Sequence, residues 1–237
     1  MTRLSIIFPI YNEEKLLLKE DFWDYYNTLK SNPSLDIHLC NGGSSDQSQK
    51  ILEQRIDDQN KYFLHSKNFT APSIAKSIEL AFSKINTEYL LILPIDCKLV
   101  VENIDKLLKK IESQNPSWGF FLKKYSPDNL ALRTLAFVLN YFRSIFCKEA
   151  VWTNAFFCHR NILNKVKWPN SSFLEDLLLS EEFNKISKPL IIKDFVFVDS
   201  RRYYPRTHHR IIKNIIILMV YRLGFRDFQK LRKFYRS

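Results

Sequence analysis

The chain has 237 residues, of which 46% are hydrophobic and 26% charged, as in a globular protein long enough for one large α/β domain. With only 4 glycines and neither GxGxxG nor GxxxxGK[ST], the sequence excludes the two common glycine-rich phosphate loops. The net charge of +11 is concentrated in residues 201–237, where eleven Lys or Arg and one acid give +10. Residues 1–200 are nearly neutral, which argues against a protein that coats nucleic acid over its whole surface. The basic tail suggests an anionic partner such as a diphosphate, a phospholipid surface or RNA.

The first half of the chain alternates short apolar runs with amphipathic segments. Strands are expected at residues 4–8, 35–40, 62–64 and 89–93. Helices are expected between them, at residues 14–31, 47–57 and 72–84. This alternation is typical of a parallel, doubly wound sheet, whose ligands bind at the carboxyl ends of the strands.

The second half continues the pattern less regularly, with strands expected at residues 118–122, 155–158 and 190–198. Helices are expected at residues 101–114, 130–146 and 177–184, and residues 130–146 have apolar side chains on nearly all sides, which predicts a helix packed between protein layers. We predict an α/β fold with a doubly wound, mostly parallel sheet in a single domain, residues 1–200. A basic, partly helical extension, residues 201–237, is expected to pack on the core or on a membrane surface.

The compartment follows from the cysteines and from the lack of targeting segments. The four cysteines show no CxxC pair and no metal-binding spacing, which favours free thiols in a reducing compartment. We expect no signal peptide and no transmembrane helix, since no apolar run reaches 18 residues. A cytoplasmic protein is therefore predicted. Residues 211–225 fit either an interfacial helix on anionic lipid at the inner face of the membrane or a helix packed on the core.

Carboxylates stand at two positions where chemistry is expected. Asp96 follows the most apolar strand, where it is either a turn cap or a metal ligand, and caps are commoner. Glu175 and Asp176 open the helix expected at 177–184, where acids complement the helix dipole but where one could also serve as a general base. Position alone does not separate these roles.

Six motifs follow one another along nearly the whole chain: LSIIFPIYNEE, NGGSSDQS, PIDCK, AFFCHRNIL, FLEDLLLSEEF and DSRRYYPRTHHR. None is specific by itself, but their order and spacing resemble the GT-A-fold glycosyltransferases of the family 2 type. The resemblance is strongest to the short bacterial subgroup associated with radical-SAM and selenium-related gene sets.

This resemblance implies roles for particular residues. Asp96 would hold Mg²⁺ or Mn²⁺ against the diphosphate, and Asp176, with Glu175 beside it, would be the catalytic base. The resemblance also implies substrate-binding residues. Pro9, Tyr11 and Glu13 would lie in the nucleoside loop, Asn41 at the base and Lys67 near the phosphates. Asn154 would lie near the acceptor pocket and Arg202 in the basic tail. The implied partners are a nucleotide-diphospho-sugar donor and an unknown hydroxyl acceptor, with an anionic membrane surface as a further option.

The resemblance also implies an inverting transfer, in which Asp176 deprotonates the acceptor hydroxyl. Three departures leave an alternative open. Pro94 replaces the first acid of the DxD-type element, and residues 152–154 are Trp-Thr-Asn where the subgroup has Gly-Asp-Gln. Residues 66–72 replace the subgroup's glycine- and arginine-rich loop before the third helix. The alternative is a degenerate relative that binds a nucleotide or a partner without turnover, and a third hypothesis makes the tail an RNA-binding module. The enzyme hypothesis requires that Asp96 and Asp176 converge on one pocket.

Overall fold

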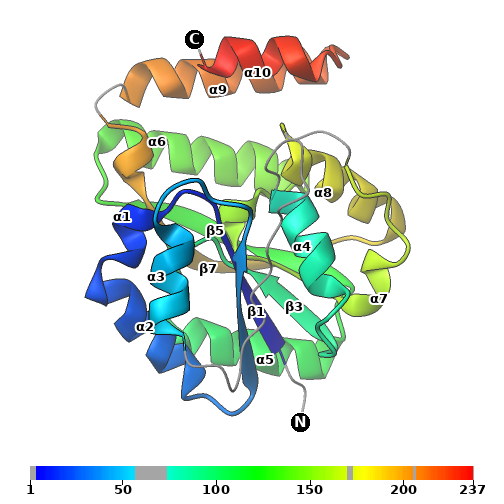
Figure 1. Ribbon diagram of the computed structural model, residues 1–237. Helices are drawn as coiled ribbons and strands as arrows, with labels where there is room; N and C mark the ends of the chain where they lie inside the picture. The colour runs from blue at the N-terminus through cyan, green and yellow to red at the C-terminus, as the bar shows by residue number, and fades with distance from the viewer. Residues whose placement is uncertain (1–3, 57–73, 170–172, 205–206, 237) are drawn as a thin grey trace.

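The first strand is β1, Leu4–Ile10, and all of its residues are buried. The computed structural model describes residues 4–56, 74–169, 173–204 and 207–236. Within these residues a seven-stranded sheet has the order β2-β1-β3-β6-β5-β7-β4 (Figure 1). The other strands are β2 Leu35–Asn41, β3 Tyr89–Ile92, β4 Cys97–Lys98, β5 Trp118–Ser126, β6 Phe156–His159 and β7 Leu190–Asp199.

The sheet is mixed. Strand β1 runs parallel to β2 and β3, and β5 runs parallel to β7. Strand β6 is antiparallel to both β3 and β5, and the short β4 is antiparallel to β7. The predicted α/β fold is thus confirmed, with the expected parallel order around β1 and an antiparallel β6 joining the two halves. The strand predicted at 62–64 lies outside the described residues.

Helices cover both faces of the sheet, which is why its strands read as continuous apolar runs rather than alternating ones. Ile6 and Phe8 of β1 belong to a hydrophobic cluster that includes residues of α2, α3, α5 and α6, whereas Ile7 belongs to a second cluster with residues of α4, α7 and α8. The helices before β6 are α1 Glu14–Leu17, α2 Glu20–Lys30, α3 Ser48–Arg55, α4 Ile74–Phe82, α5 Val101–Gln114 and α6 Leu130–Val138. Those after it are α7 Arg160–Leu163, α8 Glu175–Ile186, α9 Thr207–Arg222 and α10 Phe228–Arg236.

Strand β5 approaches β7 closely at Gly119. A Cβ atom at this position would lie 2.2 Å from the Leu190 carbonyl oxygen and 2.4 Å from the Phe157 ring. Only glycine permits this spacing, because neither a backbone oxygen nor a packed ring can yield by that much. The close approach fixes the pairing of β5 with β7, and the far ends of these two strands carry several of the residues described below.

The prediction for residues 130–146 is wrong about burial. The segment is helical, as α6 followed by a π-helical stretch, η2 Leu139–Phe146, in which the Cys147 N–H donates to the Phe142 carbonyl. One face is buried against the sheet, but Leu130, Phe142 and Phe146 are 81%, 66% and 82% exposed. The physical reason is that α9 packs beside α6 without covering its outer side (Figure 1).

Residues of the basic extension form α9 and α10, which lie as a separate layer beyond α6 (Figure 1). The Tyr221 hydroxyl donates to Glu181 at 2.8 Å, and the Arg222 guanidinium pairs with the buried Glu149. Ile217 and Leu231 are buried beneath the two helices. Among the described residues, no helix combines the length and the hydropathy needed to cross a bilayer.

Candidate active site

A cavity of about 330 Å³ opens at the carboxyl ends of β5 and β7, between the sheet and the C-terminal helices. Asp96, from the turn after β3, and Asp176, from the start of α8, both line it. Two carboxylates that are 80 positions apart in the sequence therefore face one pocket, which is the condition that the enzyme hypothesis sets. The opposite wall comes from the extension, with Arg210 and Asn214 of α9 and Tyr235 of α10.

Asp176 is held by backbone amides. Its Oδ1 accepts a hydrogen bond from Leu177 N at 2.8 Å, and its Oδ2 accepts one from Trp152 N at 3.3 Å. The preceding turn places Leu174 at a φ of 57°, a left-handed conformation that is strained for a residue with a bulky side chain. Strain of this kind often accompanies functional sites, because the surroundings must hold the unfavourable backbone in place.

Glu175, the other carboxylate of the pair, points elsewhere. It is 7% exposed and does not line the cavity. Its Oε1 accepts hydrogen bonds from Ala75 N at 3.2 Å, at the start of α4, and from Trp152 Nε1 at 3.4 Å. These hydrogen bonds fix the start of α8 and the neighbouring turn. Of the two carboxylates, only Asp176 faces the cavity.

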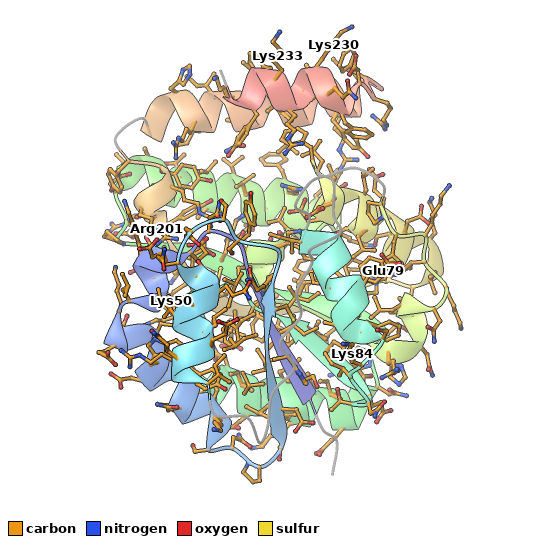
Figure 2. All side chains as sticks on the ribbon, in the orientation of Figure 1. Lys50, Glu79, Lys84, Arg201, Lys230 and Lys233 are labelled. Carbon is orange, nitrogen blue, oxygen red and sulfur yellow. The ribbon has the colours of Figure 1, made fainter. Side chains whose placement is uncertain are left out.

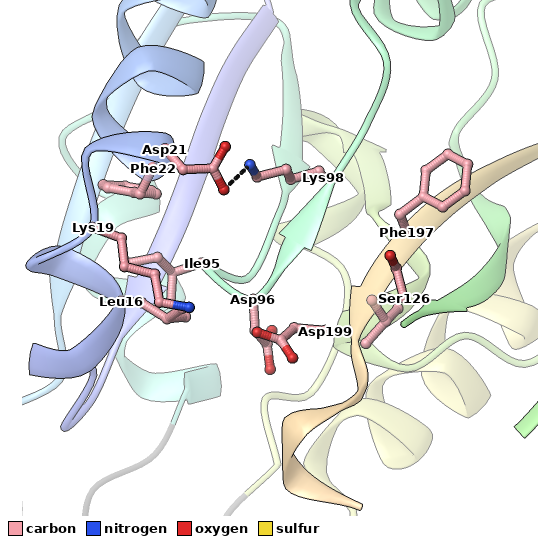
Figure 3. A pocket seen from close by; sticks show the side chains of 11 residues that line it. Leu16, Lys19, Asp21, Phe22, Ile95, Asp96, Lys98, Ser126, Phe197 and Asp199 are labelled. Atoms are coloured by element: carbon pink, nitrogen blue, oxygen red, sulfur yellow. Dashed lines mark hydrogen bonds and ion pairs between the residues drawn. The ribbon is translucent and has the colours of Figure 1, made fainter. Parts of the chain in front are cut away.

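Asp96 has a second carboxylate beside it. The Asp199 N–H donates to the Asp96 carbonyl oxygen at 2.8 Å, and the two side chains lie next to each other (Figure 3). Both also border a smaller cavity of about 210 Å³ on the side of α1 and α2. Sequence reasoning missed Asp199, because an acid after the last strand carries no distinctive local pattern.

Glu13 connects the first loop to the extension. Its carboxylate, 7% exposed, pairs with both Arg201 and Arg202 of η4 Ser200–Arg202, and Arg201 lies at this junction in Figure 2. Arg202 also approaches Asp96, with Nη2 at 3.4 Å from Oδ2. Through Arg202, two of the predicted site residues, Glu13 and Asp96, share one cation at the rim of the cavity.

The remaining predicted residues that the structure describes do not line this cavity. Pro9 is buried in β1, and Tyr11, in the loop that follows, is 40% exposed. Asn41 is fully buried, and its carbonyl oxygen already accepts hydrogen bonds from the Ser44 N–H at 3.0 Å and the Ser44 hydroxyl at 2.7 Å.

Asn154, in the short turn η3 Trp152–Asn154, is 2% exposed. Its amide donates to the Phe121 carbonyl at 2.8 Å, and its side-chain oxygen accepts from Val151 N at 3.2 Å. These bonds tie η3 to β5, so Asn154 supports the cavity wall, while the neighbouring Thr153 lines the cavity. Lys67 lies outside the described residues.

Two cations, a buried lysine and a mostly buried arginine, were not predicted from the sequence. Lys123 of β5 and Arg143 of η2 both line the cavity. Burial, together with the charge of nearby Arg143, lowers the pKa of Lys123 to about 8, and the negative charge of Asp176 partly opposes the shift. Burial also lowers the pKa of Arg143, again opposed by Asp176. The two cations therefore lie in the field of Asp176.

The donor set around Asp96 fits a hard divalent cation that is completed by a ligand. Among the described residues, no group of three or more His, Cys, Asp or Glu side chains could hold a metal ion without other ligands. Asp96 and Asp199 offer carboxylate oxygens, which Mg²⁺ and Mn²⁺ favour, but these ions need six ligands. The site therefore suits a metal that takes its other ligands from water and from phosphate oxygens.

We predict that Glu13→Gln destabilises the protein, because it leaves two arginines without their shared buried carboxylate. The expected loss in the free energy of unfolding is about 1–2 kcal/mol, below the roughly 3–5 kcal/mol of a fully buried pair, since Arg202 is 59% exposed. Urea unfolding measures it. Glu20→Gln, which breaks an exposed pair with Arg55, is the matched control and should change stability little. Equal effects of the two substitutions would contradict the assigned role of Glu13.

An uncharacterized protein of Methanocaldococcus jannaschii is 27% identical over 185 residues, which are 75% of this chain and 76% of that protein. The structure of S. aureus TarS 1–349 superposes with a TM-score of 0.65 at 14% identity, over 99% of this chain and 69% of the other. The same fragment is also known in complex with UDP-GlcNAc.

The mannosyltransferase of Pyrobaculum calidifontis, in complex with GDP-Man and Mn²⁺, superposes with a TM-score of 0.65 at 15% identity, over 91% of this chain and 62% of the other. These similarities establish a shared GT-A fold. In sequence, residues 5–168, well over half of the chain, match the description of glycosyl transferase family 2. The chain belongs to glycosyl transferase family 2.

Proposed function

We propose that this protein transfers a glycosyl group from a nucleotide-diphospho-sugar to an acceptor hydroxyl, with inversion and with the help of Mg²⁺ or Mn²⁺. The observation that carries the proposal is that Asp96 and Asp176, in a family 2 chain, line one cavity. We also propose that the protein belongs to the short bacterial subgroup that its motifs resemble.

The leaving diphosphate belongs at the Asp96 end of the cavity. Asp96 and Asp199 would hold the metal there, and the metal would neutralise negative charge on the diphosphate. Arg202, which already lies between Glu13 and Asp96, would add a positive charge on the same side. Structural neighbours support this type of donor, since S. aureus TarS binds UDP-GlcNAc and the Pyrobaculum enzyme binds GDP-Man with Mn²⁺.

The acceptor hydroxyl belongs at the Asp176 end. The Asp176 carboxylate would take the hydroxyl proton while the acceptor oxygen forms a bond to the anomeric carbon and the bond from that carbon to the diphosphate breaks. Backbone amides of Trp152 and Leu177 hold the carboxylate in position for this transfer. Glu175 would act as a positioning residue, because its hydrogen bonds fix the start of α8.

The nucleoside would lie along the loops that follow β1 and β2. These loops brace each other, since the Asn12 side-chain oxygen accepts from Ser45 N at 2.8 Å and Glu13 N donates to the Ser48 hydroxyl at 2.9 Å. Tyr11 is exposed and available to stack on a base. Asn41 would contribute through the turn that it holds, and Lys67 and Pro9 stay in the proposal as residues near the phosphates and in the nucleoside loop.

We predict that Asp176→Asn abolishes transfer while nucleotide binding is kept. Loss of a general base typically costs about 10²- to 10⁴-fold in rate, and the amide preserves the shape of the site. The measurement is release of nucleoside diphosphate from a panel of UDP- and GDP-sugars. Asp128→Asn, which removes an exposed carboxylate paired with Arg133, is the control and should retain activity. Unchanged turnover in Asp176→Asn would exclude it as the base, whereas a wild-type protein that binds donors without turning them over would favour the degenerate alternative.

We predict that UDP or GDP raises the melting temperature only when Mn²⁺ or Mg²⁺ is present, because Asp96 and Asp199 would hold the metal and its charge would offset the repulsion between these carboxylates and the diphosphate. In Asp96→Asn the metal-dependent part of the shift should be lost. The measurement is a thermal-shift titration of each nucleotide with the metal and with EDTA. An equal shift in EDTA would contradict the proposed metal site.

We also propose that the protein contacts an anionic lipid surface through its C-terminal helices. The exposed apolar side chains of α9, with the residue that directly follows it, recur at helical spacing along one face: Ile212, Ile216, Met219 and Leu223. The adjacent α10 projects Lys230 and Lys233 away from the sheet (Figure 2). An apolar stripe next to basic side chains matches the chemistry of an anionic membrane surface.

We predict that the protein sediments with vesicles containing anionic lipid and that this binding falls steeply with salt. Leu223→Glu should weaken the binding, because it places a negative charge in the stripe. Ile186→Glu makes the same change at an exposed position of α8 and serves as the control. Binding that is insensitive to salt, or equal in the two variants, would contradict the proposal.

A further inference from the structure

The Asp176 end of the cavity holds a buried ammonium without an anionic partner. Lys123 is 5% exposed, and Asn140 clamps its backbone by accepting from Lys123 N at 3.1 Å and donating to its carbonyl at 2.9 Å. The ammonium contacts the Thr153 hydroxyl at 3.4 Å, but in the described part of the chain it forms no ion pair with a carboxylate. A buried charge in this state costs stability, so its presence needs a reason.

Arg143 is compensated only in part. Its Nε and Nη2 atoms are buried and have no hydrogen-bond partner among the described residues. Its ion pair with Glu149 is long, 3.7 Å from Nε to Oε2, and Glu149 also pairs with Arg222. Arg210, which is exposed on the same cavity, forms no ion pair with a carboxylate of the described chain. Positive groups therefore exceed negative ones around Asp176, even with Glu149 counted.

The two ends of the cavity differ in this respect. At the Asp96 end, Arg202 is matched by Glu13 and Asp96. At the other end, Lys123 has no carboxylate partner among the described residues and Arg143 shares Glu149 with Arg222, while the proposed reaction needs Asp176 as a free base. An anionic ligand would complete the compensation of these cations, and its place is beside the base rather than beside the leaving group.

We propose that the acceptor carries an anionic group, a phosphate or a carboxylate, which binds between Lys123 and Arg143 and holds the acceptor hydroxyl at Asp176. This inference rests on the proposed function for the identity of the acceptor. The anion itself is recognised by charge-assisted hydrogen bonds from the guanidinium and the ammonium. The low pKa of Lys123 is consistent with this role, since an anion would restore the charged form that burial disfavours.

The test uses three probes of known charge: inorganic phosphate, glycerate and uncharged glycerol. Calorimetry should detect phosphate or glycerate binding to the wild-type protein and none for glycerol. The phosphate and glycerate arms decide which anionic group the site takes. Lys123→Met, which keeps the length of the side chain and removes its charge, should weaken anion binding about tenfold or more.

Lys124→Met is the matched control, because Lys124 is exposed on the other face of β5 and lies over Phe195. It should bind the anion as the wild type does. Lys123→Gln, which keeps a hydrogen-bond donor for Thr153, should behave like Lys123→Met if charge is what binds. Equal anion affinity in wild type and both Lys123 variants, or no anion binding to the wild type, would overturn the proposal.

Two further readouts separate this inference from its alternatives. At pH 7 the unliganded Lys123→Met variant should melt at the same temperature as the wild type or higher, because it loses an uncompensated charge; a lower melting temperature would overturn that account. Binding of UDP or GDP with Mn²⁺ should be unchanged in Lys123→Met, whereas its loss would assign Lys123 to the donor and overturn the acceptor role. If no nucleotide binds the wild type, the proposed function fails while the anion measurement still stands.

Discussion

The buried carboxylate of Glu13 is the constraint on which the arrangement of this site depends. A carboxylate removed from water requires positive partners, and both partners, Arg201 and Arg202, lie 188 and 189 positions further along the chain. The pairing holds the end of β7 against the loop after β1. Because α9 follows directly, the same contact brings the C-terminal helices over the cavity, and it places Asp199 beside Asp96.

The C-terminal extension is therefore part of the site. Its charge of +10 divides by position: Arg202 faces the acidic end of the cavity, Arg222 neutralises the buried Glu149, and Arg210 lies on the cavity wall. Lys230 and Lys233 of α10, by contrast, point away from the rest of the molecule (Figure 2). A net charge counted from sequence cannot make this division, since it depends on which side of each helix packs inward.

The sequence predicted the sheet from its alternating segments, and it placed Asp96 after a parallel strand, at the edge where ligands bind. The meeting of Asp96 with Asp176 was expected from the family resemblance, because Asp176 opens α8 and follows no strand directly. The sequence did not predict Lys123, although alternation in β5 places that residue on the same face as the buried Phe121 and Tyr125 and could have indicated it. Arg143 gave no local signal, since its burial depends on the π-helical turn and on α9. The exposure of residues 130–146 likewise depends on how far α9 extends over them. The spacing of apolar residues along a helix does not predict this.

The charge distribution of the cavity follows the direction of the proposed reaction. Carboxylates lie at the Asp96 end and suit a divalent cation, whereas the Asp176 end holds Lys123 without a carboxylate partner and Arg143 with unused N–H donors, which suit an anion. In an inverting transfer, negative charge develops on the leaving diphosphate while the acceptor loses a proton at the opposite end. An anionic acceptor fixed by Lys123 and Arg143 would bring its hydroxyl to Asp176 without adding charge near the diphosphate. A site with this polarity selects the acceptor by its charge and the donor by its metal, so the two substrates would not compete for the same end of the cavity.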